Sequence, residues 1–257
     1  SVFEQLFEDA GTSLSERLTL LDSTVIARHA WTDGGLLDLY PDREQSRESI
    51  AQFAGSDNAT GFDRFYAQSE KIHRALSSTF MAATKPNPLS LVGRVLRQHP
   101  PSSLLAARPS PDLWRALGGF FSDERLQQLF GRYATYVGSS PLSTPATLML
   151  IAHVELDGVW LVDGGMHRLA RAMADLGQEL GVDLHLNTHV NEVLVKNRKA
   201  VGVRLDDGTV LTADAVIFNG DTQAIATGQL GESAASAVTL RPTNQRALSA
   251  FTWCIKG

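Results

Sequence analysis

The sequence predicts a protein of mixed α and β structure, with a mainly helical first half and a last third rich in short strands. Apolar residues recur at three- and four-residue steps from residue 46 to about residue 130, which is typical of amphipathic helices. In the last third, short runs rich in β-branched residues are separated by turn signals such as Asp206-Asp207-Gly208. A strand, a helix and then several strands predict an α/β layer that continues into a β-meander.

The elements before residue 46 follow from local signals. Residues 2–7 have apolar side chains at helical spacing and Gly11 behind them, so we expect a short helix. Three β-rich runs follow at residues 18–22, 25–31 and 36–40. The Asp-Gly-Gly turn at residues 33–35 predicts that these runs form a small antiparallel sheet.

The last third is expected to alternate between one helix and several strands. The helix covers residues 166–180, and the fully apolar residues 215–218 suit a buried parallel strand. The other expected strands are residues 159–162, 182–186, 190–195, 200–205 and 209–211.

Composition and charge exclude several classes of function. The chain has 257 residues, and its 23 Lys and Arg against 28 Asp and Glu give a net charge of -5, which disfavours nucleic-acid binding. The single cysteine, Cys254, excludes an internal disulfide and fits a reducing compartment, so the cytoplasm is the expected location. No apolar run reaches the ~20 residues of a membrane-spanning helix. Because the first residues lack an initiator Met and any leader pattern, we expect the chain to be an internal fragment.

Metal binding and nucleophilic catalysis find little support in the residues. His185 and His189 are four residues apart, but no carboxylate or cysteine stands at a zinc-site spacing, so we expect no metal. Cys254 lies between Trp253 and Ile255, a setting typical of a buried thiol. The sequence contains neither a Gly-x-Ser-x-Gly elbow nor a Gly-x-Gly-x-x-Gly dinucleotide fingerprint.

Several motifs lie along the chain in a consistent order. The most specific is GRYATYVGSSP at residues 131–141, followed by TPA at 144–146, GVW at 158–160 and GGMHRLA at 164–170. Two later stretches agree with them, ADAVIFNGD at 213–221 and LSAFTW at 248–253. Together these motifs resemble the carotenoid desaturase (phytoene desaturase-like) family of FAD-dependent oxidoreductases. They are most similar to the branch that desaturates hydroxyneurosporene or methoxyneurosporene, and the resemblance runs from Val2 to Lys256.

The resemblance implies a function for the whole protein. It would be an FAD-dependent desaturase that transfers hydride from an apolar polyene, such as phytoene or hydroxy- or methoxyneurosporene, to the flavin, with an electron acceptor that is unknown. The family's phosphate loop and its C-terminal glycine-rich segment are absent from this sequence, so the fragment alone is expected to be inactive. Two alternatives stay open: an amine-oxidase-like or protoporphyrinogen-oxidase-like flavoprotein, and a non-catalytic module that binds a polyene or lipid.

The resemblance also divides the chain. Residues 1–158 would form the substrate domain, residues 159–232 part of an FAD-binding domain, and residues 233–257 a returning strand of the substrate domain. Residues 89–98 read as an amphipathic helix with Arg94 and Arg97 on its polar side. This helix either packs on the protein or lies on a membrane surface, which would make the protein peripherally membrane-associated.

Candidate residues near the cofactor lie in the last third. The resemblance implies that Val190, with His189 before it, lies against the adenine, although Val190 equally begins a strand. Asn219, Gly220 and Asp221 follow the apolar run at 215–218, and open α/β sheets bind ligands at the carboxyl ends of strands. Asp221 alternatively caps the helix that starts at Thr222.

Candidate residues near the substrate lie inside or beside the motifs. His153 and Glu155 form a titratable group before the strand at 159–162, and Arg132 is the third candidate catalytic residue. The expected substrate-lining residues are Tyr133, Tyr136, Trp160, Gly164, Gly165 and Met166.

Overall fold

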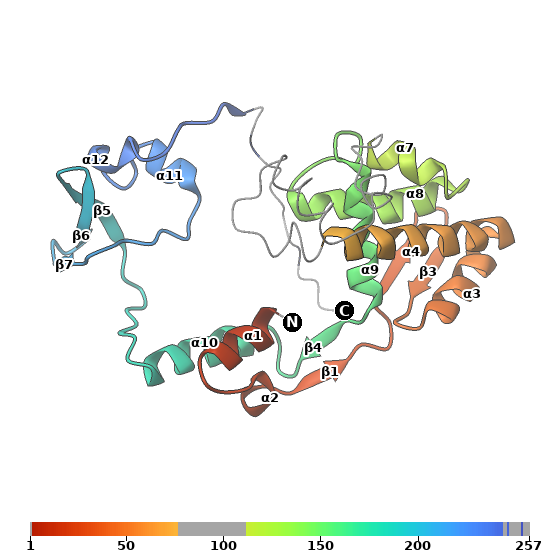
Figure 1. Cartoon of the computed structure of the whole chain (residues 1–257), viewed down its shortest axis with the longest axis horizontal. Helices are drawn as coiled ribbons and strands as arrows, with labels where there is room; N and C mark the ends of the chain where they lie inside the picture. The colour runs from red at the N-terminus through yellow and green to blue at the C-terminus, as the bar shows by residue number, and fades with distance from the viewer. Residues whose placement is uncertain (1, 77–111, 244–245, 247–252, 254–257) are drawn as a thin grey trace. The chain divides into compact units, whose positions relative to one another are not determined.

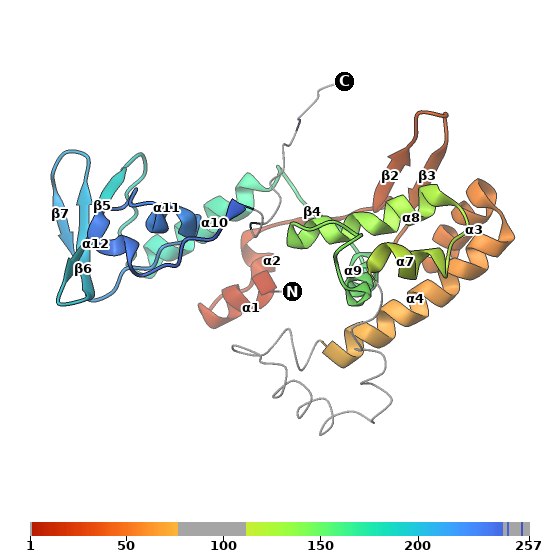
Figure 2. The same ribbon diagram turned by 90° about the horizontal axis from the view of Figure 1, so that it is seen from above.

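The structure is a computed structural model that describes residues 2–76, 112–243, 246 and 253. The chain divides into two compact units (Figures 1 and 2). Unit 1 comprises Ser1–Ala172 with Ala247–Gly257, and unit 2 comprises Met173–Arg246. The sequence predicted domain boundaries after residues 158 and 232, whereas the two units meet after residues 172 and 246. The predicted helix at residues 89–98 and Cys254 lie outside the described residues.

Unit 1 begins with two short helices and a strand. Helix α1 (Val2–Asp9) confirms the first expected helix and is followed by α2 (Leu14–Arg17) and β1 (Leu20–Asp22). Strand β1 pairs antiparallel with β4 (Trp160–Val162), where Leu21 stands opposite Leu161. The expectation that residues 18–22 join the sheet of the next two strands is therefore wrong, because their partner lies far along the sequence.

The predicted hairpin is confirmed. Strands β2 (Ala27–Ala30) and β3 (Leu36–Leu39) pair antiparallel across a turn in which Gly34 has φ +87°. The Asp33 carboxylate accepts a hydrogen bond of 2.9 Å from the Gly35 N–H, which fixes this turn locally. Leu37 and Leu39 alternate toward the core and are buried.

As far as the structure describes it, at residues 43–76 and 112–131, the helical middle of the chain is also confirmed, and aspartates begin three of its helices. Asp42, Asp112 and Asp123 each accept a hydrogen bond from a backbone N–H of the first helical turn, which satisfies a donor that the helix leaves unpaired. The helices are α3 (Arg43–Ala54), α4 (Ser56–Leu76), α7 (Leu113–Gly118) and α8 (Glu124–Gly131).

The core of unit 1 is aromatic. Ring centroids of Phe65 and Phe130 are 4.7 Å apart, and those of Phe121 and Phe130 are 5.0 Å apart. Phe62 joins them, and all four side chains are buried. Each contributes about 1.5–3 kcal/mol through burial. Phe62 and Phe65 of α4, Phe130 of α8 and Phe121 from the loop before α8 thus meet in the core of the unit.

The chain then passes from the core to β4 and α10. Two 3-10 helices, Arg132–Val137 and Ala146–Met149, precede α9 (Leu150–Leu156), which packs against α4. After β4, Gly164 and Gly165 adopt φ values of +76° and +88° in the turn to α10 (His167–Glu179). Glycine tolerates this conformation because it has no Cβ.

Unit 2 contains the predicted β-meander. Strands β5 (Val190–Lys196), β6 (Lys199–Leu205) and β7 (Val210–Thr212) pair antiparallel in that order. Helices α11 (Thr222–Ala226) and α12 (Glu232–Ala235) follow, and α12 packs against β5.

Two predicted strands of unit 2 do not form. Residues 182–186 and 215–218 have no strand assignment, and Leu186 and Ile217 are 72% and 95% exposed. A strand needs hydrogen bonds to a second strand, and none of the described residues pairs with these segments. The predicted parallel crossover is therefore absent from the described part of the chain, where every strand pair is antiparallel. The mixture of helices and small antiparallel sheets confirms the α+β class. None of the helices in this part is long and apolar enough to cross a membrane.

Candidate functional site

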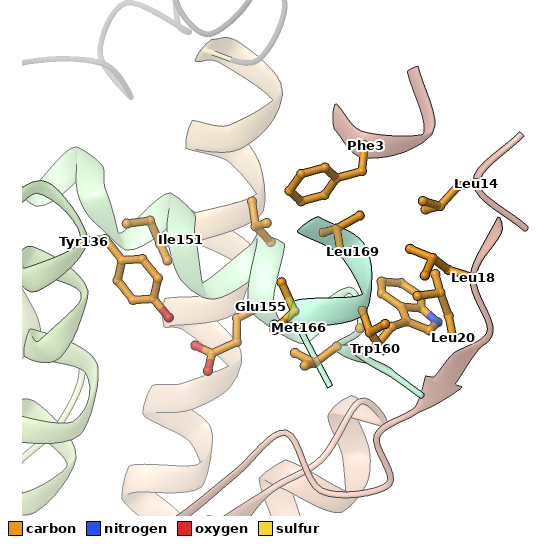
Figure 3. A pocket seen from close by; sticks show the side chains of 14 residues that line it. Phe3, Leu14, Leu18, Leu20, Tyr136, Ile151, Glu155, Trp160, Met166 and Leu169 are labelled. Atoms are coloured by element: carbon orange, nitrogen blue, oxygen red, sulfur yellow. The ribbon is translucent and has the colours of Figure 1, made fainter. Parts of the chain in front are cut away.

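Unit 1 contains an apolar pocket of about 390 Å³ (Figure 3). Its wall is assembled from α1, α2, β1, the 3-10 helix that begins at Arg132, α9, β4 and the start of α10. Among the side chains that line it are Phe3, Leu14, Leu20, Ile151, Trp160 and Leu169. Such a concave, mainly apolar surface is typical of sites for small apolar ligands.

Two structural features build this wall. The pairing of β1 with β4 places residues 20–22 beside residues 160–162. In α9, Ile151, Val154 and Glu155 lie on one helix face because they are three and four residues apart, and all three line the pocket.

The structure brings some predicted substrate-lining residues together and separates others. Tyr136, Trp160 and Met166 line the pocket and are more than half exposed. Tyr133 lies in the core instead, with no exposed surface. Gly164 and Gly165 form the turn before α10 and are not among the lining residues. Phe3, Leu14 and Leu20 were not predicted, because only the long-range pairing of β1 with β4 brings them to the site.

A group of polar side chains lies at the Glu155 side of the pocket. Arg132 Nη2 donates a hydrogen bond of 2.6 Å to Glu155 Oε1, and the Arg132 guanidinium lies 4.8 Å from the Tyr133 ring centroid. The side chains of Arg132 and Glu155 are 26% and 13% exposed. With His29, whose pKa responds to both charges, these residues form what we call the polar cluster: His29, Arg132, Tyr133 and Glu155.

Each member of the polar cluster has a buried polar atom without a hydrogen-bond partner. These atoms are His29 Nε2, Arg132 Nε, the Tyr133 hydroxyl and Glu155 Oε2. Unpaired buried polar atoms are uncommon in folded proteins and call for an explanation, such as an ordered water or a ligand.

Burial and the ion pair determine the charges of the cluster. Burial raises the pKa of Tyr133 well above its usual range, and the Glu155 carboxylate adds to this. Burial lowers the pKa of His29, and the positive charge of Arg132 lowers it further. For Arg132, burial acts to lower the pKa, but Tyr133 and Glu155 outweigh it and the pKa is raised. Near neutral pH, therefore, Tyr133 keeps its proton, His29 is neutral and Arg132 is charged.

His153, the remaining candidate catalytic residue, belongs to a different group of rings. Its ring centroid lies 4.8 Å from that of His73 and 5.7 Å from that of Tyr66, and its Nδ1 is buried without a partner. His153 is not among the pocket-lining residues. The structure therefore places Arg132 and Glu155 together and His153 apart from them.

The two histidines with lowered pKa values predict a pH dependence of stability. Burial lowers the pKa of both His29 and His73, so the unfolded chain, with a histidine pKa of about 6.5, takes up protons more readily than the folded one. Stability should be full above pH ~6.5 and fall as the pH drops below it. We expect a lower urea midpoint at pH ~5.5 than at pH ~7.5, and a smaller difference for His73→Gln. A midpoint that is constant over this range would contradict the assignment.

The predicted cofactor residues lie in unit 2, and most are engaged within the protein. Val190 begins β5 opposite Leu205, and the His189 carbonyl accepts a hydrogen bond of 3.2 Å from the Asp206 N–H. Asp221 caps α11 by accepting a hydrogen bond of 2.9 Å from the Gln223 N–H. Val190 therefore starts a strand and Asp221 caps a helix, which are the structural roles that the sequence offered as alternatives to cofactor binding.

These residues do not by themselves fit FAD. The ring of Phe218 lies where a Cβ on Gly220 would project, so there is no open ligand space beside that glycine. Asn219 is exposed, and none of the described residues of unit 2 has a buried polar side-chain atom that lacks a partner. A cavity of about 570 Å³ in unit 2 is lined by Val216 and Phe218, but not by the predicted cofactor residues.

No metal site is formed by the described residues, among which no group of three or more His, Cys, Asp or Glu side chains could hold an ion. His185 instead lies 2.9 Å from the Asp183 carboxylate on the surface of unit 2.

Comparison with known proteins identifies the family. The family described as flavin containing amine oxidoreductase matches residues 3–250. The chain belongs to this family. It is also 42% identical to a hydroxyneurosporene desaturase of Rubrivivax gelatinosus, over 99% of this chain and 48% of that protein. A hydroxyneurosporene desaturase of Cereibacter sphaeroides is 42% identical over 98% of this chain and 50% of its own length.

Two further similarities are more distant. A phytoene desaturase of Neurospora crassa is 30% identical over 86% of this chain and 38% of its own length. The crystal structure of an oxidoreductase from Methanosarcina mazei has 17% identity and a TM-score of 0.46, over 88% of this chain and 46% of that one. The resemblance to carotenoid desaturases that the motifs indicate is confirmed by the family match and the curated desaturases. The chain spans about half the length of the first curated relatives it matches.

Proposed function

We propose that the whole protein is an FAD-dependent desaturase of a carotenoid intermediate, such as hydroxyneurosporene, methoxyneurosporene or phytoene. The proposal rests on the apolar pocket of unit 1 and on the relatives named above. A pocket of this size encloses one end of a long polyene. Its aliphatic and aromatic wall binds the chain by removing apolar surface from water.

Desaturation removes two hydrogens from adjacent carbons of the polyene. Amino-acid side chains lack an acceptor for the two electrons, and FAD supplies it. The residues of this chain would bind the polyene, exclude water from it and fix its position. Of the three candidate catalytic residues, we propose that Glu155, held by Arg132, contacts the substrate, because it is the one that lines the pocket.

We also propose a division of labour between the two units. Unit 1 would carry the substrate pocket, and unit 2 would form part of the FAD-binding domain in the whole protein. Because residues 189–190 and 219–221 form no open ligand space by themselves, they would contact the cofactor only together with other parts of the whole protein. The predicted domains at 1–158, 159–232 and 233–257 stay a prediction, and they differ from the two units by assigning residues 159–172 to the FAD-binding part and residues 233–246 to the substrate part.

The proposal is tested by expressing the whole protein in a bacterial host that accumulates hydroxyneurosporene or phytoene. We expect a yellow protein with flavin absorbance, and extracted pigments with additional conjugated double bonds. Unchanged pigments together with a colourless protein would instead support the non-catalytic polyene-binding module. Oxidation of amines or of a porphyrin precursor, with no change in the polyene, would support the other two flavoprotein alternatives.

The proposed location is the cytoplasm, with peripheral contact to a membrane, since a polyene is too apolar to cross water at useful concentration. The sequence at residues 89–98 carries Arg94 and Arg97 beside apolar residues, and each cation contributes about 1 kcal/mol near anionic lipid. We expect reversible co-sedimentation with anionic vesicles at low salt, weakened when both arginines are changed to Glu. Binding that is the same for this double variant would contradict the contact.

A further inference from the structure

The polar cluster is unusual because it stands beside a pocket that is otherwise apolar. Glu155 is the only charged side chain among the described residues that line this pocket. In Figure 3, Glu155 and Tyr136 are both drawn on the side of the pocket away from Phe3 and Leu14. The pocket therefore has a long apolar part and one polar end.

The hydrogen-bonding capacity of this end is incomplete. Arg132 Nε is a buried donor without an acceptor. The Tyr133 hydroxyl lies close enough to the Glu155 carboxylate for that charge to raise its pKa, but neither the hydroxyl nor Glu155 Oε2 has a well-formed hydrogen bond. Each unpaired group disfavours the folded state unless something else supplies the missing hydrogen bond. A ligand that satisfies this end must both accept and donate.

The charges of the cluster narrow the chemistry of such a ligand. The Arg132 charge already balances that of Glu155 across a contact of 2.6 Å, so the cluster does not attract a cationic amine. A carboxylate would be repelled by Glu155. A hydroxyl group is neutral, donates one hydrogen bond and accepts two, which matches the acceptor on Glu155 and the donors on Tyr133 and Arg132.

We infer that the polar cluster is the receptor for a hydroxyl group at the end of an otherwise apolar polyene. The hydroxyl would donate to Glu155 Oε2 and accept from the Tyr133 hydroxyl or Arg132 Nε, while the hydrocarbon lies along Trp160, Ile151 and Leu20. Glu155 Oε2 is buried in the free protein, so binding requires that a side chain of the pocket wall, such as the 65% exposed Tyr136, change its position. The inference rests on the proposed function and adds the residues that select the substrate.

The test measures binding without using the flavin or the reaction. Trp160 lines the pocket, so a bound polyene should quench its fluorescence by energy transfer, and Trp160→Phe should remove that signal. Three polyenes of equal length are titrated into the whole protein: one with a hydroxyl end, one with a methyl ether and one with a hydrocarbon end. We expect the hydroxylated polyene to bind at least about tenfold more tightly than the hydrocarbon, with the ether between them because it only accepts.

Two variants examine the receptor itself. Tyr133→Phe removes a hydroxyl that has no partner in the free protein, so its melting temperature should be equal or higher, while the preference for the hydroxylated polyene falls about fivefold or more. Glu155→Gln should reduce this preference further. Tyr66→Phe, a tyrosine outside the pocket wall, is the matched control and should leave all three affinities unchanged.

The outcomes separate the inference from the proposed function. Equal affinity of the wild-type protein for all three polyenes, or a preference that both variants retain, would overturn the hydroxyl receptor and leave the desaturase proposal intact. Failure of every polyene to quench Trp160 would overturn the proposed function itself. If Glu155→Gln slows turnover of all three polyenes equally without changing their affinities, Glu155 acts in the chemistry and the receptor is overturned.

Discussion

Replacing Arg132 with methionine should lower the free energy of unfolding of unit 1 by about 3 kcal/mol. The substitution leaves the Glu155 carboxylate, only 13% exposed, without its 2.6 Å partner. Breaking a buried ion pair by removing one member costs about 3–5 kcal/mol, and the 26% exposure of Arg132 places the expected effect at the lower end. Urea unfolding measures the change as a shift in midpoint at constant slope.

The matched control removes both charges at once. In Arg132→Met combined with Glu155→Leu, no uncompensated charge is left, and most of the lost stability should return because apolar residues of similar volume replace the pair. If Arg132→Met is as stable as the wild type, or if the double variant is less stable than Arg132→Met alone, the loss of stability does not come from an uncompensated Glu155 charge.

Replacing Gly61 with alanine should also destabilise unit 1 strongly, by about 2 kcal/mol or more. Gly61 lies in α4 where the helix meets the loop between α7 and α8, and an added Cβ would overlap the backbone carbonyl of Phe120. Backbone cannot move aside as a side chain can, so the helices must separate and disturb the packing of Phe121 against Phe65. This cost exceeds the gain of about 1 kcal/mol in helix propensity from glycine to alanine.

The matched control is Gly118→Ala, near the end of α7. The nearest atom to a Cβ at Gly118 is the flexible end of Gln127, at 3.8 Å. We expect its stability to equal or slightly exceed that of the wild type. The thermal unfolding midpoints of the two alanine variants provide the comparison, and similar midpoints would contradict the close approach at Gly61.

Local signals account for what could be predicted of the fold. Aspartate caps, the Asp-Gly-Gly turn and the apolar spacing of α3 and α4 act within a few residues of one another, so their elements form as expected. Residues 182–186 and 215–218 have the composition of strands, but strand formation depends on a partner elsewhere, which their own residues do not specify. The pairing of β1 with β4 could not be foreseen for the same reason.

For the site, too, local motifs could be predicted and long-range contacts could not. Tyr136, Trp160 and Met166 were predicted from motifs and line the pocket, whereas Phe3 and Leu20 reach it only through the fold. Arg132 and Glu155 were both candidates, but their contact spans 23 residues and depends on the packing of α9 beside the 3-10 helix. His29 was missed because nothing in its hairpin sequence indicates that one ring nitrogen will be buried beside that pair.

The most direct test of the desaturase proposal follows the polyene and the flavin together. The purified whole protein, saturated with FAD, is mixed with a hydroxylated polyene in the absence of oxygen, and visible absorbance is recorded. The account predicts that the polyene absorbance shifts to longer wavelength, as a new conjugated double bond requires, while the absorbance of the oxidised flavin falls in equal molar amount. Quenching of Trp160 fluorescence without either change, with the polyene recovered intact, would contradict it and show a protein that binds the polyene without desaturating it.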